Sequence, residues 1–305
     1  MVSIIIISYN TQELTLNCID SLYRTYPEGE VIVVDNRSPD KTVEMIHRTY
    51  PDVRVIVTPE NKSYANAVNL GMNATTSEFS IVCNADVEFN EHSVERLIHF
   101  LRDNPTVGVC SPQQEYIDGS WQYCFGPTPS IIQVLFDIII LYGIINAVKS
   151  WFYPRFKKYD WPRSVGYCDG AVLAIRRHAF EEINGFDEAF AFYSEEADFC
   201  YRLTKQGWGV YFQPKATVMH IRGASSGNEM NMSENAVRKL VNSKVQFIRK
   251  HYTEQQVKLF ISLEIFNYRF KELLCNVLLR MKSTNLLQSK YRMFHMLVQF
   301  YREIR

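Results

Sequence analysis

The feature that most constrains the fold is a regular alternation of short apolar runs and amphipathic segments along residues 3–103. Ser3 to Ser8 is a continuous Ile-rich run, typical of a strand buried on both faces of a parallel sheet. The other expected strands are residues 30–34, 53–57 and 79–83, and the expected helices are residues 11–26, 40–50, 64–73 and 92–103. This alternation predicts a doubly wound α/β sheet whose ligands bind beyond the carboxyl ends of the strands.

After Val107 the alternation loosens. The most apolar window, residues 131–148, is interrupted by Gln133, Asp137 and Asn146, so it predicts a buried or interfacial helix and not a transmembrane one. Further expectations are an irregular segment at 120–129, a strand at 171–175, a helix at 176–182, short strands at 208–212 and 217–220, and a mobile loop at 223–227. From residue 235 the spacing is helical, with one apolar face made by Val237, Leu240, Val241, Val245, Ile248 and Tyr252.

The net charge of zero hides an asymmetry along the chain. Residues 236–305 hold 14 Lys and Arg against 4 Asp and Glu, whereas the first 235 residues hold 19 basic against 29 acidic side chains. A basic tail on an acidic body suggests an anionic partner for the tail. We therefore expect a catalytic domain over residues 1–230 and a basic, apolar-rich helical region over residues 231–305.

The cysteines and the N-terminus indicate the compartment. The seven cysteines form no CxxC pair, and an odd number without metal-type spacing favours reduced thiols in the cytosol. The chain begins directly with a strand-like run and has no basic segment or cleavage site before it, so we expect no secretory signal. The predicted location is cytoplasmic.

Three carboxylates crowd into four positions at Glu195, Glu196 and Asp198, with aromatic residues on both sides. Like charges this close raise the pKa of at least one carboxyl group, which is how proteins make a general base. Acidic residues also gather at helix N-termini, where the macrodipole favours them. The cluster alone is divided evenly between these interpretations.

Other polar residues follow the ends of expected strands. Asp35 follows the second strand, where it could accept hydrogen bonds from a ribose or simply close a turn. Asp86 follows the fourth strand, a suitable place to hold Mg²⁺ or Mn²⁺, although a turn carboxylate is the plainer interpretation. His220 ends a short strand, and a lone histidine is more often structural than a ligand.

The order and spacing of these segments resemble the family-2 glycosyltransferases, nucleotide-sugar enzymes with a GT-A fold. The residues that carry the resemblance are VSIIIISYN (2–10), VVDNRSPD (33–40), NKSYANAVNLG (61–71), CNADV (83–87), DGAVLAIRR (169–177), GFDEAF (185–190), YSEEADFCYR (193–202), GW (207–208) and HIRGAS (220–225). The VDN-x-S and N-A-D variants look most like the bacterial rhamnosyltransferase branch. The resemblance implies a Rossmann-like, doubly wound mixed sheet flanked by helices, with a nucleotide-sugar half at about 1–110 and an acceptor half at about 111–230.

The resemblance also implies roles for individual residues. The implied substrate-binding residues are Tyr9, Asn10, Asp35, Asn36, Asn61, Asn66, Asn84, Ala85, Asp169, Gly170, Glu195 and Asp198. Asp86 and His220 match positions that hold a divalent cation, Mg²⁺ or Mn²⁺, in relatives. Glu196 matches the catalytic base, which would deprotonate an acceptor hydroxyl during a single inverting displacement.

This chain departs from the family pattern at three positions. The usual D-x-D is Asn84-Ala85-Asp86, so one carboxylate near the cation is missing. The expected Glu-Asp is Glu-Glu, which lengthens the side chain of Glu196 by one methylene, and Ser63 replaces a frequent glycine. The first change leaves open how tightly a metal binds.

The function these observations predict is an inverting, metal-dependent transferase that moves rhamnose from a dTDP-sugar to a surface polysaccharide or a lipid-linked glycan. A UDP-hexose donor is the alternative within the family, and a sugar-nucleotide-binding protein without transfer activity is the alternative outside it. A dinucleotide-dependent oxidoreductase is disfavoured because no G-x-G-x-x-G follows the first strand.

The helical tail leaves its partner open. Basic, apolar-rich helices can lie on the inner face of the plasma membrane. Packing on the catalytic sheet, or forming a homodimer interface, is an equally open interpretation. No nucleic-acid partner is expected.

Overall fold

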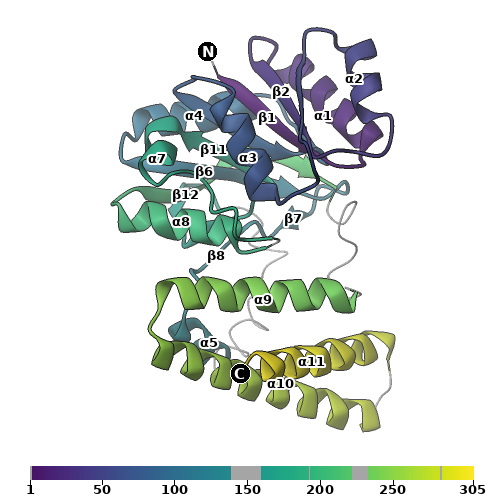
Figure 1. Ribbon diagram of the computed structural model, residues 1–305, viewed down its shortest axis with the longest axis vertical. Helices are drawn as coiled ribbons and strands as arrows, with labels where there is room; N and C mark the ends of the chain where they lie inside the picture. Colours follow the sequence, from purple (N-terminus) through teal and green to yellow (C-terminus); the bar gives the residue numbers. More distant parts are fainter. Residues whose placement is uncertain (1, 139–158, 192, 222–232, 282–283) are drawn as a thin grey trace. The chain divides into compact units, whose positions relative to one another are not determined.

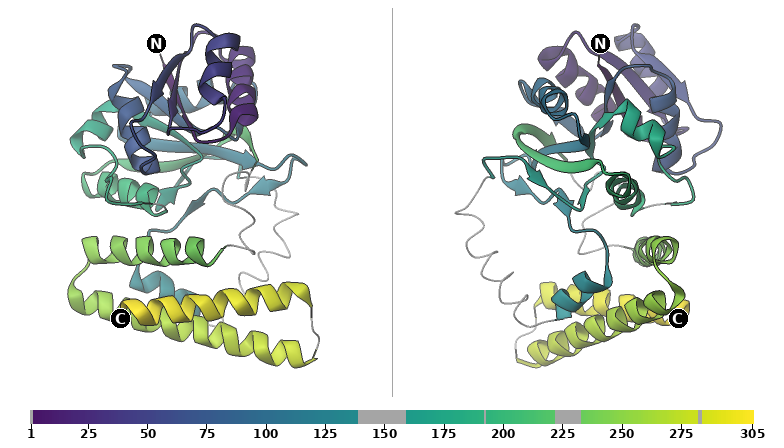
Figure 2. Two further views of the ribbon diagram at one scale, coloured as in Figure 1. Left: turned by 45° about the vertical axis from the view of Figure 1, so that its right-hand side comes forward. Right: turned by 90° about the vertical axis from the view of Figure 1, so that its left-hand side faces the viewer.

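The computed structural model describes residues 2–138, 159–191, 193–221, 233–281 and 284–305. The chain divides into two compact units (Figures 1 and 2). Unit 1 comprises Met1–Thr128, Lys158–Ala191 and Glu195–Ser225, and unit 2 comprises Pro129–Lys157, Phe192–Ser194 and Ser226–Arg305.

Unit 1 is built on a mixed sheet with the strand order β3-β2-β1-β4-β11-β6-β12-β5. Its strands are β1 (Ser3–Ser8), β2 (Glu30–Asp35), β3 (Arg54–Val57), β4 (Phe79–Asn84), β5 (Val87–Phe89), β6 (Val107–Glu115), β11 (Val172–Arg176) and β12 (Gly209–His220), with β7 (Trp121–Gln122) paired to β6 and β9 (Arg163–Ser164) paired to β12. A separate pair joins β8 (Phe125–Gly126) to β10 (Tyr167–Cys168). The first four strands are mutually parallel, and β11 is antiparallel to β4, so the predicted doubly wound mixed sheet is confirmed.

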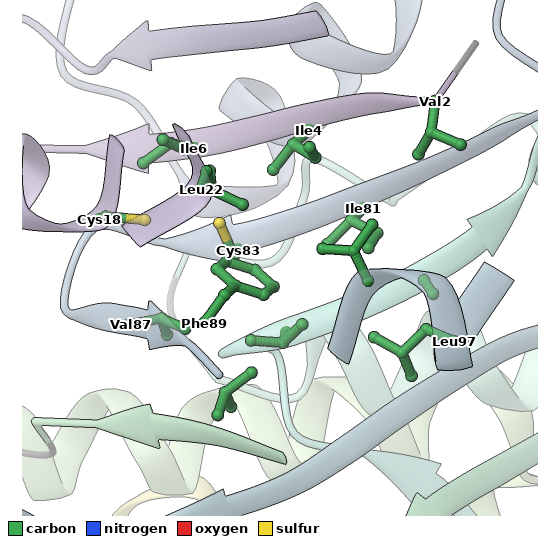
Figure 3. Packing of buried hydrophobic residues seen from close by; sticks show 14 of the residues in the cluster. Val2, Ile4, Ile6, Cys18, Leu22, Ile81, Cys83, Val87, Phe89 and Leu97 are labelled. Atoms are coloured by element: carbon green, nitrogen blue, oxygen red, sulfur yellow. The ribbon is translucent and has the colours of Figure 1, made fainter. Parts of the chain in front are cut away.

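Helices cover both faces of this sheet. They are α1 (Gln12–Thr25), α2 (Thr42–Thr49), α3 (Tyr64–Asn73), α4 (Ser93–Asp103), α7 (Arg177–Glu182) and α8 (Glu195–Lys205). Because side chains alternate along a strand, Ile4 and Ile6 of β1 pack with α1, α2 and α4, as Figure 3 shows for part of this cluster. Ile5 points to the opposite face and packs with α3, α7 and α8. The continuous apolar run therefore reflects burial on both sides.

Two later strands differ from the sequence-based expectation. The predicted short strands at 208–212 and 217–220 are one strand, β12, whose register with β6 shifts between Gln213 and Thr217. Pro214 lies in that irregularity and cannot donate a ladder hydrogen bond, so the pattern breaks while the strand continues. The expectation of two strands was therefore wrong. Strand β6 was not foreseen, because its polar residues Ser111, Gln113 and Gln114 are buried by the surrounding sheet.

Unit 2 contains the helices α5 (Ile131–Ile138), α9 (Glu234–His251), α10 (Glu254–Met281) and α11 (Asn285–Ile304). The predicted helical region is confirmed, and the apolar face of α9 buries Val237, Val241, Val245 and Ile248. Helices α10 and α11 lie side by side (Figure 2). Residues 139–148 of the predicted apolar helix and the predicted loop at 223–227 lie outside the described residues. None of the described helices is long and apolar enough to cross a membrane.

Candidate active site

The carboxyl ends of β1, β2 and β4 meet at one edge of the sheet. Ser8 pairs with Asp35 and Ile7 pairs with Asn84, so the residues that follow these strands converge there. Tyr9 is 47% exposed at this edge, and Asn10 adopts a left-handed backbone with φ 53°. This is the ligand-binding edge expected for a doubly wound sheet.

Asp35 and Asn36 organise the loops at this edge. The Asp35 carboxylate is fully buried and accepts hydrogen bonds from the backbone N–H and the hydroxyl of Ser38, at 2.7 and 2.6 Å. Ser38 Oγ in turn accepts the backbone N–H of Asn10. The Asn36 side-chain oxygen accepts the Thr58 hydroxyl at 3.0 Å. The turn-closing role foreseen for Asp35 is present in the structure.

The remaining predicted donor-side residues have different environments. Asn61 is exposed in the loop before α3, whereas Ala85 is buried and its N–H donates to the carbonyl of Ile7. The backbone N–H of Asn84 donates to the carbonyl of Ala171, which ties the end of β4 to the turn that precedes β11. The Asn66 side-chain amide donates to Glu188 at 2.8 Å.

The two predicted metal ligands are neighbours in the fold. His220 Nε2 lies 3.5 Å from Asp86 Oδ1, and each side chain is 7% exposed. Oδ1 of Asp86 is buried and has no hydrogen-bond partner within the described residues. An unpaired buried oxygen beside an imidazole nitrogen suits a divalent cation, because both are ordinary ligand atoms for Mn²⁺. No group of three or more His, Cys, Asp or Glu residues that could hold a metal ion is gathered within the described ranges.

Two glutamines hold His220 in place. Gln114 Oε1 lies 2.9 Å from His220 Nδ1, and Gln122 donates its amide to the His220 carbonyl at 2.5 Å. An accepting Oε1 requires a proton on Nδ1, which leaves the lone pair of Nε2 directed at the Asp86 side. A hydrogen bond to the other ring nitrogen orients a metal-binding histidine.

The carboxylate trio lies in the first turn of α8. Glu195 is 7% exposed, and its Oε2 is buried without a hydrogen-bond partner in the described part of the chain. Burial raises the pKa of Glu195 from 4.5 to about 7, against a smaller opposing effect of its own backbone N–H. Both sequence interpretations therefore apply, since the cluster opens a helix and also holds a perturbed carboxylate.

Glu196 lies among groups that disfavour its charged form. Burial raises its pKa well above the ordinary value, and the charges of Glu195 and Asp169 add to that effect. Tyr64 of α3 lies in the same surroundings, because burial and then the charges of Glu195 and Glu196 raise its own pKa. The Tyr64 hydroxyl donates to the carbonyl of Gly170 at 2.6 Å. The structure thus gathers the Asp169-Gly170 turn, Tyr64 and the start of α8.

Asp198 differs from its two neighbours. It is fully buried, and its Oδ2 accepts Arg202 Nε at 2.7 Å. The other guanidinium nitrogens of Arg202 donate to the carbonyls of Ile183 and Gly185, both at 2.7 Å. Asp198 is therefore compensated and anchors the segment before α8.

Several residues at the site were missed by sequence reasoning. They are Tyr64, Gln114, Gln122, Glu188 and Arg202. Only Arg202 carried a usable signal, because it follows Asp198 at the i,i+4 spacing of helical ion pairs. The glutamines meet His220 across the sheet, and Gln114 and His220 are 106 positions apart in the chain.

The sequence of this chain matches the models of two known protein families. Residues 3–183 match the model of glycosyl transferase family 2, and residues 152–223 match that of the N-terminal domain of galactosyltransferase. The chain is a member of glycosyl transferase family 2. This family spans the strands and turns that carry Asp35, Asp86 and Asp169.

Individual relatives refine the resemblance. The chain is 31% identical over 222 residues to the N-acetylglucosaminyl-diphospho-decaprenol L-rhamnosyltransferase of Mycobacterium tuberculosis, covering 65% of this chain and 68% of that protein. It is 27% identical over 209 residues to the low-salt glycan biosynthesis hexosyltransferase Agl10 of Haloferax volcanii, covering 67% and 62%. The chain therefore belongs to family 2 with a rhamnosyltransferase-like sequence.

A solved structure supports the fold. The mannosyltransferase PcManGT from Pyrobaculum calidifontis, in complex with GDP-Man and Mn²⁺, aligns over 99% of this chain and 86% of its own, with a TM-score of 0.63 at 16% identity. Together with the mixed sheet and its flanking helices, this likeness confirms the GT-A fold and the C-terminal helical region.

Proposed function

We propose that this protein is an inverting glycosyltransferase that moves rhamnose from dTDP-rhamnose to a hydroxyl of a growing cell-surface polysaccharide or lipid-linked glycan. The observation that carries the proposal is the carboxylate pair Glu195–Glu196 beside the Asp169-Gly170 turn, in a family-2 glycosyltransferase. Burial raises both pKa values, and Oε2 of Glu195 has no hydrogen-bond partner among the described residues. The name of the mycobacterial relative supports rhamnose and a lipid-diphosphate acceptor. The hexosyltransferase name of the Haloferax volcanii relative supports a hexose as the second candidate sugar, for which we propose a UDP-hexose donor.

Glu196 is the base in this proposal. It takes the proton of the acceptor hydroxyl while that oxygen forms a bond to the anomeric carbon. The bond from the anomeric carbon to the phosphate oxygen breaks, and its electron pair leaves with the nucleoside diphosphate. One displacement from the opposite face inverts the configuration, and the proton ends on Glu196. A raised pKa makes Glu196 a stronger base toward a hydroxyl than an ordinary carboxylate is.

Asp86 and His220 would hold a divalent cation, Mg²⁺ or Mn²⁺, with Gln114 fixing the imidazole. When bound, such a cation would neutralise charge on the diphosphate of the donor. Asn84 would offer an amide oxygen where relatives carry a carboxylate, and this would favour weak metal binding until the donor phosphates add their own oxygens.

The donor side of the site is assigned to residues 1–110 and the acceptor side to residues 111–230. Tyr9, Asn10, Asp35 and Asn61 surround the nucleoside in this assignment. Asn36 and Asn66 act mainly through the loops they tie down. The protein works in the cytoplasm, peripherally on the inner face of the plasma membrane.

A donor panel tests the proposal. The full-length chain is incubated with dTDP-rhamnose, UDP-glucose, UDP-N-acetylglucosamine or GDP-mannose, with Mn²⁺ and a lipid-linked N-acetylglucosaminyl diphosphate. We expect release of nucleoside diphosphate to be fastest with dTDP-rhamnose and to be lost on chelation of the metal. Faster turnover of a UDP-hexose would establish the second donor instead. Thermal stabilisation by a nucleotide sugar without any turnover would indicate a binding protein without transfer activity.

A further inference from the structure

Helix α10 is apolar on two opposite sides. On the side that packs against the other helices of unit 2, it buries Val257, Phe260, Ile261 and Cys275. On its other side, Leu259, Phe266, Phe270, Leu273 and Val277 are 45–61% exposed. A helix on the surface of a globular protein is usually polar on its outer face, so the second apolar side of α10 needs another explanation.

These exposed residues form a continuous row together with the half-buried Leu263. Residues 259, 263, 266, 270, 273 and 277 follow one another at alternating steps of four and three, which places them on one side of an α-helix. We call this row the α10 stripe; it consists of Leu259, Leu263, Phe266, Phe270, Leu273 and Val277. At 1.5 Å per residue, it extends for about 27 Å.

Unit 1 offers no comparable surface among its described residues. Its exposed large apolar side chains are Tyr9, Val57, Tyr116, Ile117, Tyr123 and Trp161, which come from separate loops and strand ends. Seven such residues lie on α10 alone, since Leu274 and Leu278 flank the stripe. Scattered apolar residues are usual on a protein surface, whereas a row of this kind marks an interaction site.

Cations border the stripe. Arg269 lies between Phe266 and Leu273 on the helix surface and is 54% exposed, with Glu272 at 3.8 Å. Arg280 is exposed and continues the row seven residues after Leu273. The carboxylates of Glu264 and Glu272 are buried at 1% and 9% exposure. Beyond its first turn, the described part of α10 therefore exposes cations beside the stripe and no carboxylate.

We propose that the α10 stripe docks on an anionic lipid surface, with Phe266 and Phe270 inserted among the acyl chains and Arg269 and Arg280 at the headgroup phosphates. Apolar insertion and cationic contacts are the two contributions that hold an amphipathic helix in the membrane interface. A second copy of the chain is the less suitable occupant, because pairing two stripes would bring like-charged arginines together without exposed carboxylates. The excess of ten positive charges over residues 236–305 favours the same partner.

This inference extends the membrane-side part of the proposed function, but lipid binding can be measured without donor or acceptor. The full-length chain is sedimented with vesicles of phosphatidylcholine alone and of phosphatidylcholine mixed with phosphatidylglycerol, at low and high salt. We expect binding to the mixed vesicles, weakened by salt. The double variant Phe266→Ser/Phe270→Ser should lower the partition coefficient about tenfold or more. Arg269→Gln should lower it about fivefold.

Two matched controls are available in unit 1. Ile117→Ser removes an apolar side chain that is 71% exposed, and Arg48→Gln removes an exposed cation of α2. Neither should change vesicle binding. If the double phenylalanine variant unfolds on heating at a lower temperature than the wild type, Arg269→Gln/Arg280→Gln tests the same surface through charge alone.

Two results would overturn the inference. One is equal vesicle binding by the wild type and both double variants. The other is a wild-type dimer in light scattering that becomes a monomer in the phenylalanine variant while neither protein binds vesicles, which would assign the stripe to a second copy. Donor stabilisation, measured without vesicles, reports on the proposed function separately.

Discussion

Each unit buries a glutamate, and the two glutamates differ in whether a cation compensates the carboxylate. Glu195 in unit 1 is 7% exposed, with Oε2 unpaired among the described residues. Glu264 in unit 2 is 1% exposed and bonds Lys244 at 2.5 Å. Burial alone would lower the pKa of Lys244, but Glu264, together with Tyr301 and Tyr268, outweighs burial and raises that pKa. Burial therefore does not identify a functional carboxylate, whereas burial without compensation does.

The same contrast between a compensated and an uncompensated carboxylate is found within the first turn of α8. Asp198 is as deeply buried as Glu195, yet Arg202 compensates it. The fold thus distinguishes members of a trio that look equivalent in sequence. We expect chemistry to depend on the uncompensated members and stability to depend on the compensated ones.

Glu196→Gln should give the largest effect. Loss of the proposed base should lower kcat about 10²–10⁴-fold, because a positioned proton transfer contributes that much. The thermal unfolding midpoint should not fall, since glutamine is close in shape to glutamate and removes a charge that burial disfavours. Release of nucleoside diphosphate and a melting curve measure the two. Undiminished turnover would remove Glu196 from the role of base.

Glu264→Gln should show the opposite behaviour. Removing one partner of a buried ion pair leaves Lys244 uncompensated and should lower the free energy of unfolding by about 3 kcal/mol, with turnover retained below the transition. Urea unfolding gives the value. The control is Glu254→Gln, which removes a glutamate that is 81% exposed and paired to Lys258. A control as damaging as Glu264→Gln would contradict the distinction between buried and exposed pairs.

The pH dependence of folding stability in Glu195→Gln tests whether the buried Glu195 carboxyl group lacks a compensating partner. The folded-state pKa of about 7 exceeds the unfolded value of 4.5, so the folded protein holds this proton more tightly. Wild-type stability should therefore fall as pH rises from about 4.5 to about 7, by about 3 kcal/mol at most for this group. The variant lacks that contribution, so its stability relative to the wild type should increase between pH 5 and pH 8. Urea unfolding at both pH values decides the point, and a difference independent of pH would refute it.

The sequence predicted the parts of this picture that local patterns encode. The helix Tyr64–Asn73 and the strand Ser3–Ser8 agree with the expectation, because apolar periodicity follows directly from which faces are buried. Strand β6 escaped prediction since its glutamines look like those of an exposed segment until β12 and β7 cover them. The order of the parallel strands places Asp35 and Asp86 at one edge of the sheet, so this shared position could be foreseen from topology.

The partners of buried polar and charged side chains could not be predicted in the same way. Lys244 meets Glu264 from another helix, 20 residues away in the chain, and Gln114 meets His220 across the sheet. Such pairs depend on tertiary packing and leave no periodic trace. The carboxylate cluster at 195–198 was visible in the sequence, but which of its members lacks a partner was not.

The smallest expected effect concerns Gln114, which holds His220 beside Asp86 Oδ1, an oxygen without a hydrogen-bond partner among the described residues. Gln114→Ala removes the acceptor for His220 Nδ1, frees the imidazole to rotate or change tautomer, and should weaken Mn²⁺ binding about 10–100-fold. Gln114→Glu keeps an acceptor at that position and should restore binding. Gln113→Ala is the matched control, because Gln113 is equally buried but donates only to backbone carbonyls. Titration of Mn²⁺ followed by electron paramagnetic resonance, without donor, gives the affinity. Equal affinities for Gln114→Ala and the wild type would mean that Asp86 and His220 do not form the cation site, and that the unpaired oxygen of Asp86 serves another ligand.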